Sequence, residues 1–181
     1  MKKVEGQVRI PSGCAISAVI SRDGTRMTGE KIIESMKPMH DRSNGLGGGF
    51  AGYGIYPTYR DFFALHLFFD SRTTRKDCEA YLRESVEIVH AEQIPTRKTP
   101  LITDEPLIWR YFVAPLKSVL SNLQLDEKEL IARIVMNINT NRKGAYVFSS
   151  GKNMGVFKAV GFPEDVGYYY RLEEYDAYSW T

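Results

Sequence analysis

The chain has 181 residues, of which 43% are hydrophobic and 25% charged, a balance typical of a soluble globular protein. Its formal net charge of +2 is too small to indicate a nucleic-acid or membrane partner. The two cysteines, Cys14 and Cys78, imply no disulfide framework and suit a reducing cytoplasm. Residues 2–7 lack the apolar core of a secretion signal, and no run is long enough to cross a membrane. We therefore expect a cytoplasmic protein with one sizeable domain or two small interlocked ones.

Residues 1–13 are polar and end in turn-forming residues, which indicates a leader segment and candidate propeptide. The apolar, β-branched run 15–20 follows and predicts a buried strand with Cys14 at its start. The thiol then has two possible roles, as a small hydrophobic core residue or as a nucleophile at the mouth of a sheet. If the chain were cut between Gly13 and Cys14, the new α-amino group, with a pKa near ~8, would lie beside the thiol and act as its base.

Next along the chain we expect a helix, capped by Thr28 and carrying Glu30 in its first turn. Its predicted buried face consists of Ile32, Ile33, Met36 and Met39. Five glycines then occur within residues 45–52. Three of them match a dinucleotide-binding fingerprint formally, but they follow a helix and open a strand, which is the wrong context. We interpret the block as a glycine-dense strand that lets another backbone or a substrate approach closely.

Residues 59–161 predict the order β-α-β-α-β-β, close to a split βαβ sandwich with two helices on one face of a sheet. Residues 62–69 are apolar on both faces, as in a fully covered strand. A helix is expected to begin near Thr74 and Asp77, with one side formed by Cys78, Leu82, Ser85 and Val89. Cys78 is thereby predicted to be a core thiol.

A strand at 108–113, a short helix at 115–123 and a longer helix then follow. Asp126 and Glu129 resemble a capping box at the start of the longer helix, and residues 141–144 end it. Its predicted apolar stripe consists of Leu130, Ile131, Ile134, Val135 and Ile138. Residues 145–149 and 156–160 predict a hairpin that turns near Asn153. The last twenty residues are acidic and rich in tyrosine.

The histidines at 40, 66 and 90 lack metal-ligand spacing, so no metal site is predicted, and no other pattern indicates a cofactor. His66 lies in an apolar strand and is expected to be a core histidine with satisfied hydrogen bonds. Residues 143–148 match an RNA-recognition strand in part, but the second half of the aromatic pattern is missing. We therefore expect no nucleic-acid partner.

Three stretches carry a family resemblance: residues 12–16 around Cys14, residues 39–50 with the glycine block, and residues 53–57. Together they resemble the opening of a class II glutamine amidotransferase domain, most of all the short archaeal-type form associated with glutamate synthase. The likeness covers essentially the whole chain, and the glycine block is its most specific part. It implies an N-terminal-nucleophile (Ntn) hydrolase fold of the α+β class, with two stacked β-sheets between helical layers. It also implies that a cysteine attacks the side-chain amide of glutamine, and that ammonia passes to a synthase partner.

Within this resemblance, Cys14 matches the nucleophile. The family binds the amino-acid end of glutamine through a His-Thr-Arg-type strand and completes its oxyanion hole with a later Asn-Gly pair. Neither motif is recognisable here, and Asn44-Gly45 stands at a different place in the family's order. Because each missing oxyanion donor costs ~3 kcal/mol or more, the isolated chain is expected to be a poor enzyme.

The resemblance assigns residues 14–58 and 162–181 to the amidotransferase portion, and residues 59–161 to a ferredoxin-like split-βαβ insertion. The implied partners are glutamine, the remaining amidotransferase segment, and a glutamate synthase domain or subunit. The alternative is a non-catalytic α+β module for ligand sensing or protein docking, in which Cys14 is a buried core residue.

Overall fold

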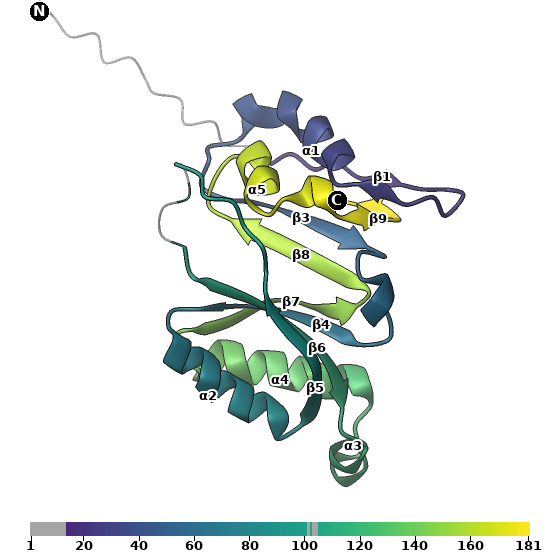
Figure 1. Cartoon of the computed structure of the whole chain (residues 1–181), viewed down its shortest axis with the longest axis vertical. Helices are drawn as coiled ribbons and strands as arrows, with labels where there is room; N and C mark the ends of the chain where they lie inside the picture. Colours follow the sequence, from purple (N-terminus) through teal and green to yellow (C-terminus); the bar gives the residue numbers. More distant parts are fainter. Residues whose placement is uncertain (1–13, 101, 103–104) are drawn as a thin grey trace, which may run out of the picture.

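The computed structural model describes residues 14–100, 102 and 105–181, so the leader assigned to residues 1–13 lies outside the described part (Figure 1). It shows a mixed α+β protein with antiparallel sheets. The strands are β1 (Val19–Ile20), β2 (Met27–Thr28), β3 (Gly48–Tyr53), β4 (Phe63–Phe69), β5 (Val86–Gln93), β6 (Leu107–Pro115), β7 (Ala145–Lys152), β8 (Met154–Ala159), β9 (Asp176–Ala177) and β10 (Ser179–Trp180). The α-helices are α1 (Glu30–Met36), α2 (Arg72–Arg83), α3 (Lys117–Leu123), α4 (Glu127–Asn141) and α5 (Pro163–Tyr169). Three 3-10 helices complete the secondary structure: η1 (Lys37–Arg42), η2 (Pro57–Tyr59) and η3 (Leu172–Glu174).

The lower sheet in Figure 1 has the strand order β5-β6-β4-β7, and α2 and α4 cover its outer face. Both faces of β4 are buried, because its side chains point alternately into two cores on opposite sides of the sheet. Leu65 and Leu67 face the helices, whereas Ala64 and His66 face the other large sheet. The sequence of elements β4-α2-β5-β6-α4-β7 and this strand order are those of a split βαβ sandwich.

One strand of this sheet was missing from the sequence prediction. Helix α2 begins after the cap residue Ser71, whose hydroxyl accepts from the Thr74 N–H at 3.1 Å, and it ends at Arg83. The helix was expected to continue to Val89, but residues 86–93 form β5 and pair with β6. The helical spacing from Cys78 to Val89 is therefore fortuitous beyond Leu82, because pairing with a strand about twenty residues away decides the conformation there.

The upper sheet has the order β1-β10-β3-β8 and lies beneath α1 and α5 (Figure 1). The two large sheets face each other, so the chain forms four layers with helices outside both sheets. The predicted hairpin at residues 145–160 is wrong in its pairing. The chain does turn at Asn153, with a φ of 51°, but β7 pairs with β4 in the lower sheet while β8 pairs with β3 in the upper one.

Two further expectations near the start of the chain are corrected. Thr28 does not cap α1, because it lies in β2 and pairs with Asp176 of β9, and Gly29 takes the N-cap position without a side-chain bond. Of the strand expected at 15–20, only residues 19–20 are in strand conformation. Strand β1 pairs with β10, whose last paired residue is Trp180, so the residues before Val19 extend beyond that partner.

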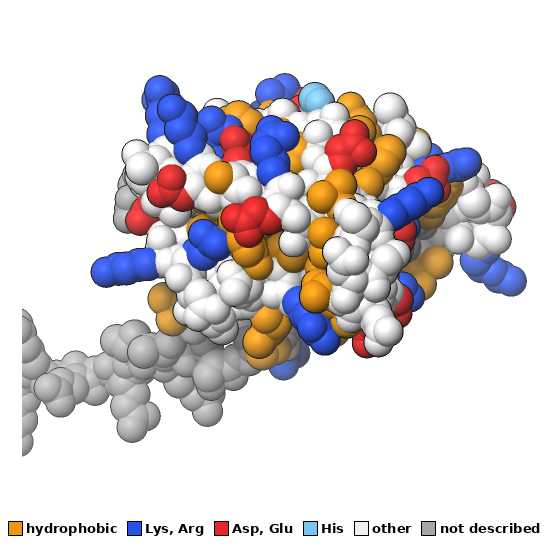
Figure 2. All heavy atoms as spheres, turned by 90° about the horizontal axis from the view of Figure 1, so that it is seen from below, with side chains coloured by type: hydrophobic (Ala, Val, Ile, Leu, Met, Phe, Trp, Pro, Cys, Tyr) orange, Lys and Arg blue, Asp and Glu red, His pale blue; other side chains and the backbone are white. Residues whose placement is uncertain are grey.

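Figure 2 views the molecule from the side of α2 and α4 and shows Lys and Arg side chains interspersed with Asp and Glu. Charges of the two signs therefore do not separate into patches on this face. None of the described helices combines the length and apolar character needed to traverse a bilayer.

Candidate functional site

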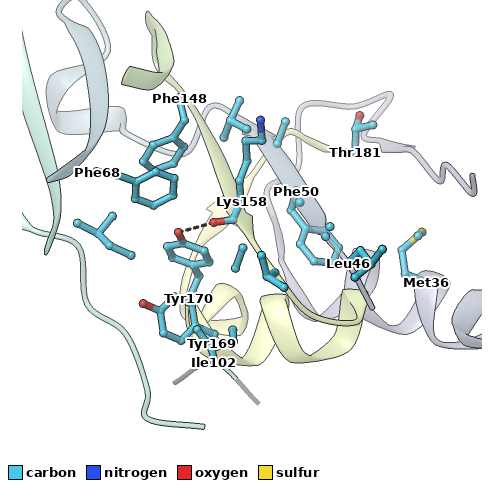
Figure 3. Close-up of a pocket in the computed structure, with 18 of the residues that line it drawn as sticks. Met36, Leu46, Phe50, Phe68, Ile102, Phe148, Lys158, Tyr169, Tyr170 and Thr181 are labelled. Atoms are coloured by element: carbon cyan, nitrogen blue, oxygen red, sulfur yellow. Dashed lines mark hydrogen bonds between the residues drawn. The ribbon is translucent and has the colours of Figure 1, made fainter. Parts of the chain in front are cut away.

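A cavity of about 1140 Å³ lies where the two sheets face each other, next to the start of the described chain. One part of its wall is formed by residues 15–17, immediately after Cys14, and another by residues 47–51 of the glycine block. Phe68 and Phe148 of the lower sheet and Lys158 of β8 also line it (Figure 3). Lys158 is the one charged residue among the described lining residues, so the cavity is mainly apolar with a single cationic side chain.

The two cysteines lie in opposite environments. Cys14 is exposed, and the three residues that follow it line the cavity. The Ser17 hydroxyl lies 2.8 Å from that of Ser35, which ties this segment to α1. Cys78, a residue of α2, is buried in the core as predicted, and burial raises its pKa to about 11. A reactive thiol must be accessible to its target and able to form the thiolate. Of the two cysteines, Cys14 is the accessible one.

Residues 48–52 of the glycine block lie in β3, and Gly52 and the nearby Gly54 permit close packing by the C-terminal segment. A Cβ atom on Gly52 would meet the Trp180 ring at 2.8 Å, and one on Gly54 would meet the Tyr178 ring at 2.1 Å. Gly54 also has a φ of 77°, a conformation that side chains rarely adopt. Another backbone does approach the block at Gly49, where a Cβ atom would meet the Phe157 carbonyl oxygen at 2.7 Å, but at Gly52 and Gly54 the approaching groups are aromatic side chains, which were not predicted.

The three histidines lie apart from one another. His66 is fully buried, His40 contacts Glu164 and stacks on Phe162 with ring centroids 4.0 Å apart, and His90 stacks on Tyr59. Within residues 14–100, 102 and 105–181, no cluster of three or more His, Cys, Asp or Glu side chains is arranged to hold a metal ion.

His66 is a core histidine with both ring nitrogens satisfied, as predicted. Its Nδ1 lies 2.8 Å from the Val156 carbonyl oxygen, so Nδ1 must carry the proton and donate it. In the neutral ring Nε2 then accepts from the Tyr56 hydroxyl at 2.8 Å. Burial lowers the pKa of His66 to about 3, so the ring is neutral near pH 7. This bonding joins β4 of the lower sheet to β8 of the upper one.

A buried arginine beside His66 escaped the sequence analysis. Arg110 is 6% exposed and lies opposite His66 in the β4–β6 pairing. Its Nε donates to Glu92 at 3.1 Å, its guanidinium lies 4.6 Å from the centre of the Tyr56 ring, and its Nη1 has no hydrogen-bond partner among the described residues. The available signal was a lone arginine inside the apolar strand 108–113, at a position that alternation places on a covered face.

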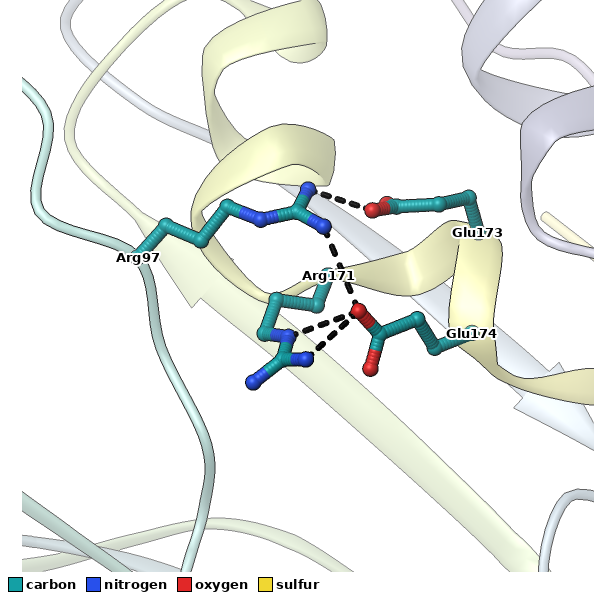
Figure 4. A network of polar contacts seen from close by, with 4 residues as sticks. All are labelled: Arg97, Arg171, Glu173 and Glu174. Carbon is teal, nitrogen blue, oxygen red and sulfur yellow. Dashed lines mark hydrogen bonds and ion pairs between the residues drawn. The ribbon is translucent and has the colours of Figure 1, made fainter.

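A second polar cluster ties the loop between β5 and β6 to the C-terminal segment (Figure 4). Arg97 pairs with Glu173 and, at 3.2 Å, with Glu174, which also accepts from Arg171 at 2.7 Å. The Arg97 guanidinium lies 4.8 Å from the centre of the Tyr168 ring. These side chains are partly exposed, so they orient the loop against α5 and η3 while contributing modestly to stability.

Comparison with known proteins finds a relative that is longer than this chain. No family profile matches the sequence. An uncharacterized protein of Archaeoglobus fulgidus is 46% identical over 171 residues, which make up 93% of this chain and 45% of the relative. The chain therefore spans less than half the length of that relative.

Proposed function

We propose that the chain is the N-terminal portion of a class II glutamine amidotransferase of the glutamate-synthase type, with Cys14 as its nucleophile. The observation that carries the proposal is the exposed thiol of Cys14, which directly precedes the segment lining the cavity. Two facing sheets enclosed by helices are compatible with the Ntn-hydrolase arrangement that the resemblance implies. In this proposal residues 59–161 are the split-βαβ insertion, although their last strand, β8, pairs with β3 in the upper sheet.

The proposed reaction begins once residues 1–13 are removed. The freed α-amino group of Cys14, with a pKa near ~8, takes the thiol proton. The sulfur attacks the side-chain amide carbon of glutamine to give a tetrahedral intermediate. Its collapse breaks the carbon–nitrogen bond, releases ammonia with the transferred proton and leaves a thioester. Water hydrolyses the thioester to glutamate and restores the thiol, while ammonia passes to a glutamate synthase partner.

The chain supplies only part of the machinery that this reaction needs. The motifs expected to bind the amino-acid end of glutamine and to complete the oxyanion hole are not recognisable in the sequence. The cavity wall adds one cationic side chain, Lys158, and mainly apolar groups. Because oxyanion donors contribute about 3–4 kcal/mol each to transition-state stabilisation, turnover by this chain alone should be very slow.

The test uses covalent labelling of Cys14 by a glutamine-mimicking diazoketone, read by mass spectrometry. Two forms are compared, the full chain and a chain that begins at Cys14, each alone and assembled with the remaining amidotransferase segment and the synthase partner. We expect an adduct on Cys14 only in the form with a free α-amino group, most rapidly in the assembly. Cys14→Ser should abolish the adduct, whereas Cys78→Ser, the matched control for the buried thiol, should retain it.

A processed assembly without an adduct on Cys14 would contradict the proposal. If Cys14→Ser also left partner binding, stability and ammonia production unchanged, the chain would be a non-catalytic docking or ligand-sensing module.

A further inference from the structure

We propose that Asn44 is a site of spontaneous deamidation, at which the Gly45 backbone nitrogen displaces the side-chain amide and the residue becomes aspartate or isoaspartate. The Asn44-Gly45 pair has no role in the resemblance to amidotransferases. The reaction needs water alone as a co-reactant, and it uses neither the Cys14 thiol nor a second protein.

The sequence singles out Asn44 among the asparagines. Asn44 is the one asparagine of the chain that is followed by glycine. Ring closure requires the backbone nitrogen of the following residue to approach the side-chain carbon of asparagine. Glycine permits this approach most readily, because it has no side chain beside that nitrogen and adopts backbone conformations that are closed to other residues. The chemistry therefore favours Asn44, provided that the fold leaves the pair able to react.

The fold does not lock the Gly45 nitrogen into regular structure. Asn44 is exposed in the loop between η1, which ends at Arg42, and β3, which begins at Gly48. The Gly45 N–H donates to the Ser43 hydroxyl oxygen at 3.2 Å, and no main-chain carbonyl of the described residues accepts from it. Gly45 has a φ of 72°, in the region that glycine adopts without strain. The attacking nitrogen is therefore held only by a local bond to a neighbouring hydroxyl.

The side chain of Asn44 is folded back over the Gly45 peptide. Its Oδ1 accepts a hydrogen bond from the Leu46 N–H at 3.1 Å, which closes an Asx turn around Gly45. The turn keeps the side-chain amide close to the nitrogen that must attack it. The same N–H polarises the side-chain carbonyl and stabilises the negative charge that develops on Oδ1 during the attack. One hydrogen bond thus contributes both proximity and electrophilic activation.

The other asparagines lie in settings that oppose ring closure. Four of them belong to helices, where the following N–H is bonded one turn back along the chain: Asn122, Asn137, Asn139 and Asn141. Both amide atoms of Asn139 are also bonded to the Val147 backbone, at 2.7 and 3.0 Å. The Oδ1 of Asn153 accepts from the Tyr56 N–H at 2.9 Å, and the next residue is methionine. Asn153 is therefore the matched non-helical control.

The proposed reaction adds a charge beside the cavity. The Gly45 nitrogen loses its proton to solvent and bonds to Asn44 Cγ, the Cγ–Nδ2 bond breaks, and the amide nitrogen takes up a proton and leaves as ammonia. Water then opens the resulting succinimide at either carbonyl, which gives aspartate or isoaspartate. The new carboxylate directly precedes Gly45, and the next two residues, Leu46 and Gly47, line the cavity (Figure 3). Lys158 is the only charged residue in the described lining, so a carboxylate here changes the local charge balance.

The test incubates the full chain at mildly alkaline pH and follows each asparagine by tryptic digestion and mass spectrometry. Asn44, in the peptide of residues 43–60, should convert at least about ten times faster than Asn153. Both aspartate and isoaspartate should form, each with one labelled oxygen when the water carries heavy oxygen. Asn44→Gln should abolish the conversion, because its ring would need six members. Equal rates at Asn44 and Asn153, or aspartate without isoaspartate, would overturn the proposal.

A comparison of the folded chain with the guanidinium-unfolded chain tests the contribution of the loop. Because the Asx turn holds the reacting groups together, Asn44 should convert at least as fast in the folded chain as in the unfolded one. Slower conversion in the folded chain would show that the fold protects Asn44 and would contradict the inference. Cys14→Ser should leave the rate unchanged, so a failure of the glutaminase proposal would not alter any of these outcomes.

Discussion

The lower and upper sheets differ in how completely each is paired and covered. The lower sheet is built from strands of seven to nine residues, and α2 and α4 cover one of its faces. In the upper sheet β1 and β10 have only two residues each, and the neighbouring residues Ile16 and Ile20 are 84% and 73% exposed. The comparison shows that one chain contains a nearly closed half and a half whose sheet and cavity remain open.

The difference between the two sheets in strand length and coverage also has a topological cause. Strand β3 pairs with β8 about 110 residues further along the chain, and β1 pairs with β10 about 160 residues further along. Such pairs form only after distant segments meet, whereas α2 and α4 form from local capping and periodicity. We therefore expect the lower half to determine most of the stability.

The largest expected effect of a substitution at neutral pH comes from truncating the core of the lower half. Leu67 of β4 is fully buried in the core between the lower sheet and its helices. Leu67→Ala should therefore lower the free energy of unfolding by about 3 kcal/mol. Ile16→Ala removes a similar apolar group from an exposed position and should change it by less than about 0.5 kcal/mol. Urea denaturation followed by circular dichroism measures both. Equal losses would show that the upper half is as closed as the lower one.

The next largest expected change in unfolding free energy comes from disturbing the packing of Trp180 on β3 in the upper half. The indole Nε1 donates to the Met27 carbonyl at 3.0 Å, which fixes the ring over Gly52. Gly52→Ala places a methyl group 2.8 Å from this ring and should cost about 2 kcal/mol in unfolding free energy. Gly47→Ala is the matched control, because its nearest contact is 3.8 Å away. If Gly52→Ala left the free energy of unfolding unchanged, β10 would pack less firmly on β3 than the structure shows.

Much of the lower half was predictable because its signals are local. The capping box at Asp126, the stripe from Leu130 to Ile138 and the doubly apolar strand at 62–69 are all present as predicted. The exception is β5, where a helical spacing continued by chance into Val89 and a distant partner decided the outcome.

The upper half was less predictable because its strands depend on partners that no local pattern reveals. Residues 15–18 have strand-forming composition, yet in this part of the chain only Val19 and Ile20 are paired, with Trp180 and Ser179 of β10. The hairpin expected around Asn153 had the right turn, but pairing sends its arms to different sheets. Cys14 was identified from its neighbours along the chain, whereas Lys158 became a cavity residue only through the β3–β8 pairing.

The buried histidine at the junction of the two sheets predicts a pH dependence. The pKa of His66 falls from its ordinary value of 6.5 to about 3 in the folded protein. Between these values the unfolded chain binds a proton that the folded protein excludes, so acid favours unfolding. We expect His66 to reduce the unfolding free energy by up to about 1.4 kcal/mol per pH unit as pH falls through this window, with its full contribution present above pH 6.5.

His66→Gln isolates this contribution, because the side chain keeps a donor and an acceptor but does not titrate. The variant should be less stable at pH 7 and show a shallower loss of unfolding free energy between pH 6.5 and about 3 in urea titrations. Carboxylates contribute equally to both proteins, so their effect cancels in the difference between the two profiles. If the unfolding free energies of the two proteins changed in parallel with pH, His66 would be exposed to water in the folded protein and would not titrate with a lowered pKa.

The smallest expected change in stability concerns the N-termini of two helices, α4 in the lower half and α1 in the upper half. Helix α4 in the lower half has a complete capping box, with the Glu129 N–H donating to Asp126 at 2.8 Å and the Asp126 N–H donating to Glu129 at 3.2 Å. Asp126→Ala should therefore cost about 1 kcal/mol, whereas Asp126→Asn should cost a few tenths. Helix α1 in the upper half follows its N-cap residue Gly29, which makes no side-chain cap bond, so the start of this helix depends on packing. Thermal and urea denaturation of the two Asp126 variants would separate them, and equal stability would show that tertiary contacts hold α4 without its cap.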